Sequence, residues 1–515
     1  MAQPTHPYSI TAPGFMGLNT ADAPVDMDNK FALEANNCII DKYGRIGSRS
    51  GWSKVHTVSA TLSTANVESI GELIESDGTK TIITTGNNKI FKLVGTTLTE
   101  LTYGGGGTTP TITTSNWQHC VINNAILFFQ EGYTPLVYDT AVSTTQYKRI
   151  SEHASYSGTV QLSNTCISAY GRIWNARTTT DKNTLQWSDT LTYQKWTAGS
   201  SGTLNLYGVW PQGGDEIVAL AAHNNSLIIF GSKQILVYSG ANTPSTMALS
   251  DAIGNSGCIG RDTVQNTPDD VLFLSSGGLR SLKRTIQEKS APLTLASRTV
   301  NDDILSYIQN EGSGATIKSV YSPTHSFYLL TFVKSLITYC FDTRVEMPDG
   351  SNRVTTWSGT VPKCYCYSLS RNLYFGQSGY IAKYGTYLDD SSTYRMSYYI
   401  PWVDFGDPIR ISILKKISAT MVGAVNQVLT YKWGFDYVPQ SRSEQVTIGT
   451  GATPAEYGIG EYGVAEYTTG LIIDRISINS GGSGKVVQVG FEVDINSAAV
   501  SIQRIDVYTK DGAYK

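Results

Sequence analysis

Cysteine and histidine are the side chains of this sequence that could bind a metal ion or act in nucleophilic catalysis. Seven cysteines are scattered along the chain, and only Cys364-Tyr365-Cys366 brings two of them close together. Alternate strand residues would point both sulfurs to one face, but a metal site needs two more ligands, which the sequence does not offer. The six histidines form no pair at metal-ligand spacing. We therefore predict no metal and no cofactor, and we expect reduced cysteines with structural roles.

Carboxylates are plentiful, but they do not form a recognisable catalytic motif. Glycoside hydrolysis needs two carboxylates flanking the scissile bond, and the aspartate-box pattern of sialidases (Ser-x-Asp-x-Gly-x-x-Trp) is absent; Trp187-Ser188-Asp189 is not a copy of it. The sequence also lacks a G-x-S-x-G elbow, a phosphate-binding loop and a dinucleotide fingerprint. We therefore expect that the protein is not an enzyme.

One segment repeats acidic and aromatic residues at a fixed spacing. The pairs recur every five residues: Glu456-Tyr457, Glu461-Tyr462 and Glu466-Tyr467. A period of five fits neither a helix nor a strand, so we expect an extended, exposed loop. Its tyrosines either pack on the sheet below or take part in a function that depends on the rest of the molecule.

The elements that must position these residues are β-strands. A hairpin signature recurs through the middle of the chain: an apolar run, a break of Gly, Asn, Ser or Lys, and a second apolar run, as in Ile82–Leu93. The second runs begin 44 to 58 residues apart, at Ile90, Leu136, Leu185, Ile235, Leu279, Ile337 and Ile381. Units of this length hold four strands, which is typical of propeller blades.

The sequence thus predicts an all-β protein with a β-propeller of six or seven blades, since an outer unit could belong to the neighbouring domain. A β-sandwich with evenly spaced hairpins is the alternative. We expect an N-terminal arm over residues 1–58, the propeller over 59–390 and an antiparallel β domain over 391–515, on which the arm packs. A short helix is expected within 293–308. The strands of the last domain are expected, from alternating apolar and polar residues, over 411–421, 427–437, 471–478, 485–495 and 501–508.

The charge pattern excludes several classes of protein. The net charge is −3 and charged residues make up 16% of the chain, below the roughly 25% of an average soluble domain. There is no basic field that would hold nucleic acid through its phosphates.

The opening residues, Met1 to Ser9, are too polar for a secretion signal. The longest apolar stretch, Phe327 to Phe341, is too short and polar to span a bilayer, so we expect no membrane span and assembly in a reducing cytoplasm.

Loose motifs along nearly the whole chain give a resemblance to a known family. Gly44-Arg45-Ile46 and Arg49-x-Gly51-Trp52 precede the repeats, and the fifth unit opens with Ile259-Gly260-Arg261-Asp262-Thr263. After the repeats come the Glu-Tyr-Gly pairs, then Gly481 to Gly484, then Ile502 to Tyr508. This order resembles the tail nozzle, or packaged-DNA stabilisation protein, of short-tailed bacteriophages.

The resemblance implies a structural protein of the virion tail, made and assembled in the host cytoplasm. It implies a homohexameric ring below the portal and its adaptor ring, with propellers on the outside that dock tail fibres or spikes. Double-stranded DNA would pass through the ring without sequence-specific binding, and the ring would gate its ejection. The strand–turn segment of the arm would contribute to the platform that touches the adaptor, through Tyr43, Arg45, Arg49 and Trp52.

Under this hypothesis the repeated Glu-Tyr pairs become candidates for the channel lining and gate. An acidic wall lets DNA slide, whereas lysine and arginine would grip its phosphates. Copies of Glu456, Glu461 and Glu466 would make acidic rings, and Tyr457, Tyr462 and Tyr467 could pack across subunits. The alternatives are a receptor- or glycan-binding propeller of a phage tail and a propeller glycan hydrolase.

Overall fold

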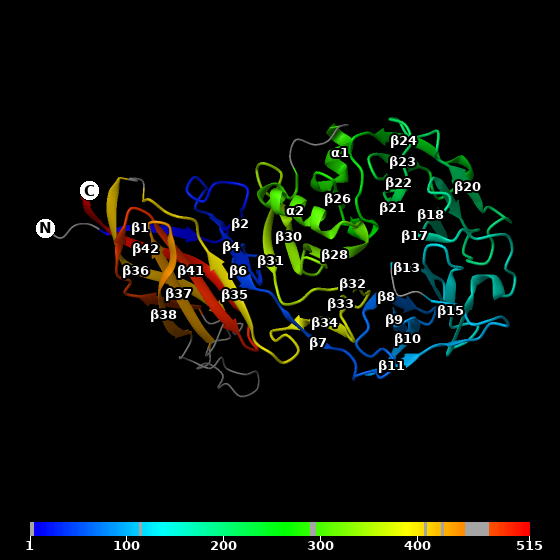
Figure 1. Cartoon of the computed structure of the whole chain (residues 1–515), viewed down its shortest axis with the longest axis horizontal. Helices are drawn as coiled ribbons and strands as arrows, with labels where there is room; N and C mark the ends of the chain where they lie inside the picture. The colour runs from blue at the N-terminus through cyan, green and yellow to red at the C-terminus, as the bar shows by residue number, and fades with distance from the viewer. Residues whose placement is uncertain are drawn as a thin grey trace, which may run out of the picture.

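The structure is a computed structural model that describes residues 5–112, 116–288, 295–405, 409–423, 427–448 and 473–514. The Glu-Tyr pairs lie outside these described residues. Two β-rich domains lie side by side along the long axis, and both chain ends lie in the smaller one (Figure 1). The expectation of an all-β fold with a propeller and a second antiparallel domain is confirmed.

The larger domain is a β-propeller whose first four blades follow one another along the chain (Figure 1). The first two blades are formed by β8 (Val67–Ile74), β9 (Lys80–Gly86), β10 (Lys89–Val94) and β11 (Thr97–Glu100), and by β12 (Thr102–Tyr103), β13 (Gln118–Ile122), β14 (Ala125–Phe129), β15 (Leu136–Asp139) and β16 (Gln146–Arg149). The next two are β17 (Ser163–Ala169), β18 (Arg172–Thr178), β19 (Thr184–Trp187) and β20 (Gly202–Asn205), and β21 (Ile217–His223), β22 (Ser226–Gly231), β23 (Ile235–Ser239) and β24 (Ala248–Ile253).

Three further units complete the ring. They are β25 (Gln265–Asn266), β26 (Val271–Ser275) and β27 (Gly278–Ser281), then β28 (Ile317–Ser322), β29 (Phe327–Phe332), β30 (Ile337–Glu346) and β31 (Asn352–Trp357), then β32 (Cys364–Tyr367), β33 (Leu373–Gly376) and β34 (Ile381–Thr386) with β7 (Gly51–Lys54). Six of the units are sheets of their own, whereas β28–β31 is part of a larger, eleven-stranded sheet. One unit is therefore shared with the neighbouring domain.

The hairpins form because their breaks contain residues that accept a left-handed backbone. Asn87 and Asn88 join β9 to β10 with φ of 50° and 58°, and Asn224 and Asn225 join β21 to β22 with φ of 47° and 60°. Asparagine pairs tolerate this conformation, which gives a two-residue turn whose twist matches that of the strands. All seven predicted second-run residues lie in the third strand of their unit counted outward from the propeller axis, at or near its start: Ile90, Leu136, Leu185, Ile235, Leu279, Ile337 and Ile381.

The ring closes by pairing of distant segments. The first strands of neighbouring units contact one another around the axis, and β32 of the last unit contacts β8 of the first. Strand β7 from the N-terminal region pairs antiparallel with β34, with Trp52 opposite Tyr384. Residues 51–54 therefore complete the last blade, and the arm enters the propeller as well as the second domain.

The second domain is a sandwich of two sheets. One contains β39 (Ile473–Ile478), β36 (Arg410–Gly423), β42 (Val500–Tyr514), β1 (Thr5–Thr11), β6 (Ile46–Ser48), β5 (Cys38–Ile40) and β40 (Ser483–Gly484). The other contains β4 (Glu34–Asn36), β35 (Tyr394–Tyr399), β41 (Val487–Ile495), β37 (Gln427–Phe435) and β38 (Val438–Ile448). β1 pairs with β42 over its whole length. Residues of the N-terminal region are thus built into strands of both sheets.

The two domains share one sheet and one core. β4 lies between β31 of the propeller and β35 of the sandwich, so the eleven-stranded sheet runs from one domain into the other. The short strands β2 (Gly17–Leu18) and β3 (Phe31–Ala32) join its side. A single cluster of buried apolar residues contains Tyr328 and Phe341 of the propeller together with Phe491 and Ile505 of the sandwich. This continuity resists independent movement of the two domains, because bending would expose buried apolar surface.

The described residues contain two α-helices, α1 (Leu282–Glu288) and α2 (Asn301–Glu311), both beside the fifth unit. The helix expected within 293–308 begins at Asn301 and ends at Glu311, so Asp302 and Asp303 lie in its first turn. Carboxylates are favoured there by the helix dipole. Neither helix is long and apolar enough to span a membrane.

Candidate functional site

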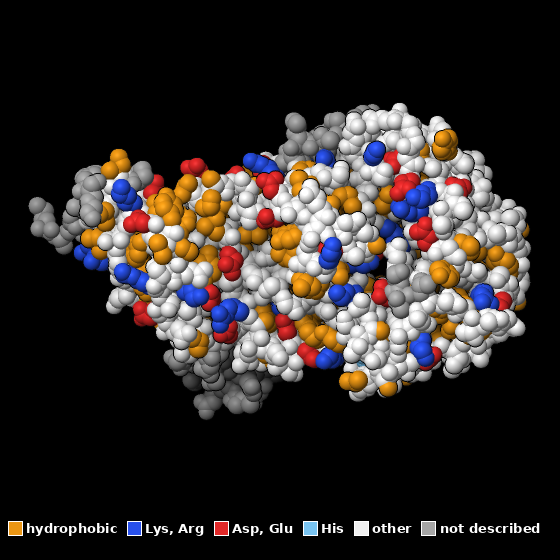
Figure 2. All heavy atoms as spheres, in the orientation of Figure 1, with side chains coloured by type: hydrophobic (Ala, Val, Ile, Leu, Met, Phe, Trp, Pro, Cys, Tyr) orange, Lys and Arg blue, Asp and Glu red, His pale blue; other side chains and the backbone are white. Residues whose placement is uncertain are grey.

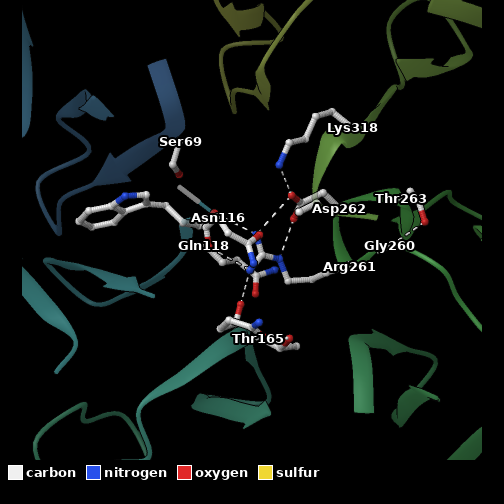
Figure 3. Close-up of polar contacts among 12 residues, drawn as sticks. Ser69, Asn116, Gln118, Thr165, Gly260, Arg261, Asp262, Thr263 and Lys318 are labelled. Atoms are coloured by element: carbon white, nitrogen blue, oxygen red, sulfur yellow. Dashed lines mark hydrogen bonds and ion pairs between the residues drawn. The ribbon is translucent and has the colours of Figure 1, made fainter. Parts of the chain in front are cut away.

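The centre of the propeller holds a polar cluster built on Arg261 and Asp262 (Figure 3). Both belong to a short 3-10 turn, Arg261–Thr263, that leads into β25. The Arg261 guanidinium donates to the carbonyl oxygens of Asn164 and, at 3.0 Å, of Trp117. These carbonyls lie at the inner strands of the third unit and the second unit. One side chain from the fifth unit therefore ties two other units together across the axis.

Asp262 is held by two cations. Arg261 Nε lies 2.8 Å from Oδ1, and Lys318 Nζ of β28 lies 2.5 Å from Oδ2. Burial opposes ionisation of Asp262, but the charges of Arg261 and Lys318 outweigh it and hold the pKa of the carboxyl well below its usual range. Asp262 therefore stays ionised and acts as a fixed link between the fifth and sixth units.

A polar cavity of about 210 Å³ lies beside this cluster, lined by residues of the first, second, fifth, sixth and seventh units. Figure 2 shows a small opening near the centre of the ring. Burial raises the pKa of Glu68, at its wall, to about 7, against the opposing charges of Lys318 and Lys363. Glu68 therefore keeps its proton to a higher pH than an exposed glutamate does.

The cavity contains one pair that could suggest nucleophilic catalysis. Ser69 Oγ lies 2.8 Å from His119 Nδ1, but burial lowers the pKa of His119 to about 4, which makes it a weak base at neutral pH. Ser69 is only 4% exposed. Among the described residues no group of three or more His, Cys, Asp or Glu could hold a metal. The arrangement suits a polar plug that joins blades better than it suits bond-breaking chemistry.

The four residues expected at the adaptor platform separate into two kinds. Tyr43 is 51% exposed, and the cations of Lys42 and Arg45 lie 4.9 and 4.4 Å from its ring centroid. Trp52 is buried in β7, donates from Nε1 to Thr360 Oγ1 at 3.0 Å and stacks on Tyr380. Of these side chains, Tyr43 has the open surface that an adaptor contact requires, and this contact stays a prediction.

Arg49, the fourth of these residues, is 1% exposed and belongs to the junction between the domains. Its guanidinium makes two bonds to the Asp389 carboxylate, of 2.9 and 2.7 Å, and Nε donates to Asn37 Oδ1 at 2.9 Å. It also lies 4.1 Å from the ring centroid of Tyr394. Arg49 therefore fixes the end of the last blade against the sandwich.

In the sequence, Arg261 and Asp262 stood out only as part of a motif at the opening of the fifth unit, with no role predicted for them. The available signal was an Arg-Asp pair at the opening of the fifth unit, ahead of its apolar runs, in a chain with few charges. The six residues of the Glu-Tyr loop, Glu456, Tyr457, Glu461, Tyr462, Glu466 and Tyr467, lie outside the described residues, so their role also stays a prediction.

Several solved structures align with this chain at low sequence identity. The extracellular domain of the one component system BT4673 from B. thetaiotaomicron aligns with 66% of this chain and 40% of its own, at 12% identity and a TM-score of 0.41. The Neurospora crassa Pan2 WD40 domain aligns with 65% of this chain and 96% of its own, at 10% identity and a TM-score of 0.39. YCF48 from Cyanidioschyzon merolae aligns with 65% and 99%, at 12% identity and a TM-score of 0.39.

This chain therefore spans about two fifths of the first of these structures, 40% of its length. The scores are too low to carry an argument about function. No curated protein sequence matches the chain. Residues 200–360, which run from the third unit to just past the sixth, match the protein family described as Bacteriophage P22 Gp10, beta-propeller, and this match supports a structural propeller protein of a phage.

Proposed function

We propose that this protein is the tail nozzle of a short-tailed phage, a homohexameric ring that continues the DNA channel below the portal and adaptor ring. The observation that carries the proposal is the match of residues 200–360 to the P22 Gp10 propeller family. The resemblance in sequence to the tail nozzle family covers nearly the whole chain and supports the same function.

The architecture suits a load-bearing ring subunit. The shared sheet and continuous core join propeller and sandwich rigidly, and Arg261 bridges blades across the propeller's own axis. A cavity of about 210 Å³ crossed by such bonds is too small for a DNA duplex, so DNA would pass through the centre of the ring of subunits and not through a propeller. Charged side chains of both signs are interspersed on the face seen in Figure 2, so that face has no broad cationic field to hold DNA.

The proposal is tested by mixing the purified protein with its adaptor ring and measuring the mass of the complex by light scattering. We expect six copies per ring, and negative-stain images should show propellers around a central channel. A stable complex with one copy per adaptor ring would contradict the nozzle function.

A glycan- or receptor-binding propeller is the second candidate, and one cavity favours it. A hollow of about 280 Å³ on the second unit is lined by Phe128, Tyr133 and Arg149 among others. Tyr133 is 39% exposed, and an exposed aromatic face beside polar groups is a usual platform for sugars. Binding of host envelope polysaccharide that is lost in Tyr133→Ala would favour this function, and turnover of the polysaccharide would indicate a hydrolase.

A further inference from the structure

The outward side of the β39–β36–β42 sheet carries exposed cations. Side chains alternate along β42, so Ile505 and Val507 enter the core whereas Arg504, Asp506 and Tyr508 point outward. The side chains of Arg475 and Arg504 are 55% and 47% exposed. We call the outward residues Lys416, Ile473, Arg475, Arg504 and Tyr508 the basic face.

The basic face is held in a fixed arrangement. Arg475 and Arg504 stand in one row, each opposite Thr420 of the strand between them, which sets their backbones about 10 Å apart. Both bind Asp506, at 3.2 and 2.6 Å, but this carboxylate is only 1% exposed. Arg475 also donates to the Tyr508 hydroxyl at 2.7 Å. The surface that a partner would meet is therefore cationic, although a carboxylate orients it from below.

An exposed apolar side chain lies within this face. Ile473 points outward at the edge of the sheet, two residues before Arg475 on β39, and is 69% exposed. An isolated exposed aliphatic residue is ordinary, but here it adjoins charges of one sign. Such a combination of an apolar centre and charged rim fits a protein partner with an acidic rim.

The same chain carries a surface of that complementary kind. The loop between β2 and β3 exposes Asp22, Asp26 and Asp28 around Val25, which is 47% exposed. Asp302, exposed in the first turn of α2, adds a further carboxylate and is adjacent in sequence to Asp303, to which Thr20 at the start of the loop binds. We call these five residues the acidic loop.

The acidic loop is also anchored. The amides of Thr20 and Ala21 donate to the Thr299 carbonyl at 2.8 and 3.2 Å, and Thr20 Oγ1 donates to Asp303 at 2.7 Å. Asn19, 1% exposed, donates to Asp22 Oδ2 at 2.8 Å. A rigid loop loses little conformational freedom when it binds, which favours association.

We propose that the basic face of one copy binds the acidic loop of a second copy, with Ile473 against Val25 and Arg475 and Arg504 against the loop carboxylates. The two surfaces are different, so the contact is head-to-tail, and a head-to-tail contact closes into a ring when its rotation allows. The inference rests on the proposed function, because it names the subunit interface of that ring.

The test uses two charge-reversal variants of the full chain. The face variant is Ile473→Glu/Arg475→Glu, which leaves the shorter Arg504–Asp506 pair intact, and the loop variant is Val25→Lys/Asp26→Lys. Sedimentation velocity at low salt, alone and with the adaptor ring, measures self-association. We expect each variant to weaken association at least about tenfold, and higher salt to weaken that of the unmodified chain.

The decisive measurement is whether assembly is recovered when the two variants are combined. An equal mixture of the two variants pairs an intact face with an intact loop and a reversed face with a reversed loop, so it should assemble, as should a chain that carries all four changes. The control, Val142→Glu/Tyr207→Glu/Leu249→Glu, makes the same change in net charge as the face variant at exposed propeller positions and should change association by less than twofold. Circular dichroism checks that each variant is folded.

The possible failures are distinguishable. If the unmodified chain forms rings and the face and loop variants do so equally well, the interface is wrong and the nozzle function is unaffected. If the variants fail to assemble but neither the mixture nor the combined chain recovers, the two surfaces do not meet. If the unmodified chain forms no ring with the adaptor, the proposed function is also wrong. Loss of binding to a 30-base-pair duplex by a face variant that still forms rings would assign the face to DNA and overturn the proposal.

Discussion

Replacement of Asp389 tests whether the junction between propeller and sandwich depends on the buried guanidinium of Arg49. Asp389→Asn keeps the size of the side chain but removes the charge that faces Arg49 across two bonds of 2.9 and 2.7 Å. Removing one partner of a buried ion pair costs about 3–5 kcal/mol, since the remaining charge is left in a poorly solvated place. The Asp389 side chain is 15% exposed, and water can partly replace it, so we expect a loss of about 3 kcal/mol.

The assay is hydrogen exchange of the amides around the junction, because a chain with two joined domains need not unfold in a single step. The free energy of local opening should fall for amides of β7 and β35 and change much less in the first four blades. Tyr43→Ala is the control, because this exposed residue should change stability by less than about 0.5 kcal/mol. A loss below about 1 kcal/mol in Asp389→Asn, or equal protection at the junction, would refute the reasoning.

Three further predictions follow from the axis and the ring closure. Asp262→Asn should lower the free energy of unfolding at pH 7. Because the folded-state pKa of this carboxyl is depressed, the difference in free energy from the unmodified protein should shrink as pH falls below about 4. Urea titrations measure this difference, and a difference independent of pH would contradict the ion-pair account. Glu68→Gln should raise the melting temperature at pH 8 but not at pH 4. The pKa of Glu68 is raised from 4.5 to about 7, so the stability of the unmodified protein falls as pH rises through this range, and glutamine removes this loss. Equal melting temperatures of the variant and the unmodified protein at pH 8 would count against the prediction. Trp52→Ala removes a side chain that is 8% exposed from β7, the strand that closes the ring. It should lower the free energy of unfolding by about 3–5 kcal/mol and make the last blade sensitive to limited proteolysis. Unchanged resistance to the protease would show that β7 does not close the ring.

The strand pattern was predictable because it depends on neighbours along the chain. Alternating apolar residues and turns such as Asn87-Asn88 fix each hairpin locally, so every predicted second run lies in the third strand of a unit. The alternating segments after residue 410 correspond to β36, β37, β39, β41 and β42, but β42 continues to Tyr514, well past the predicted end at residue 508, and β38 was not predicted. The one expected helix was placed too early, since its first turn is set at Asn301 beside the fifth unit.

The sequence by itself determined the fold class and the repeating unit, because side-chain period and turn chemistry are short-range properties. Only the tertiary structure decided how the units join. β7 pairs with β34 more than 300 residues away, and β4 pairs with β31 and so joins the sheet of the sixth unit to the sandwich. Arg261 donates hydrogen bonds to backbone carbonyls of two other blades. These contacts depend on the path of the whole chain and cannot be predicted from a local sequence pattern. As a result Arg49 and Trp52 are buried in the junction, whereas Tyr43 stays at the surface.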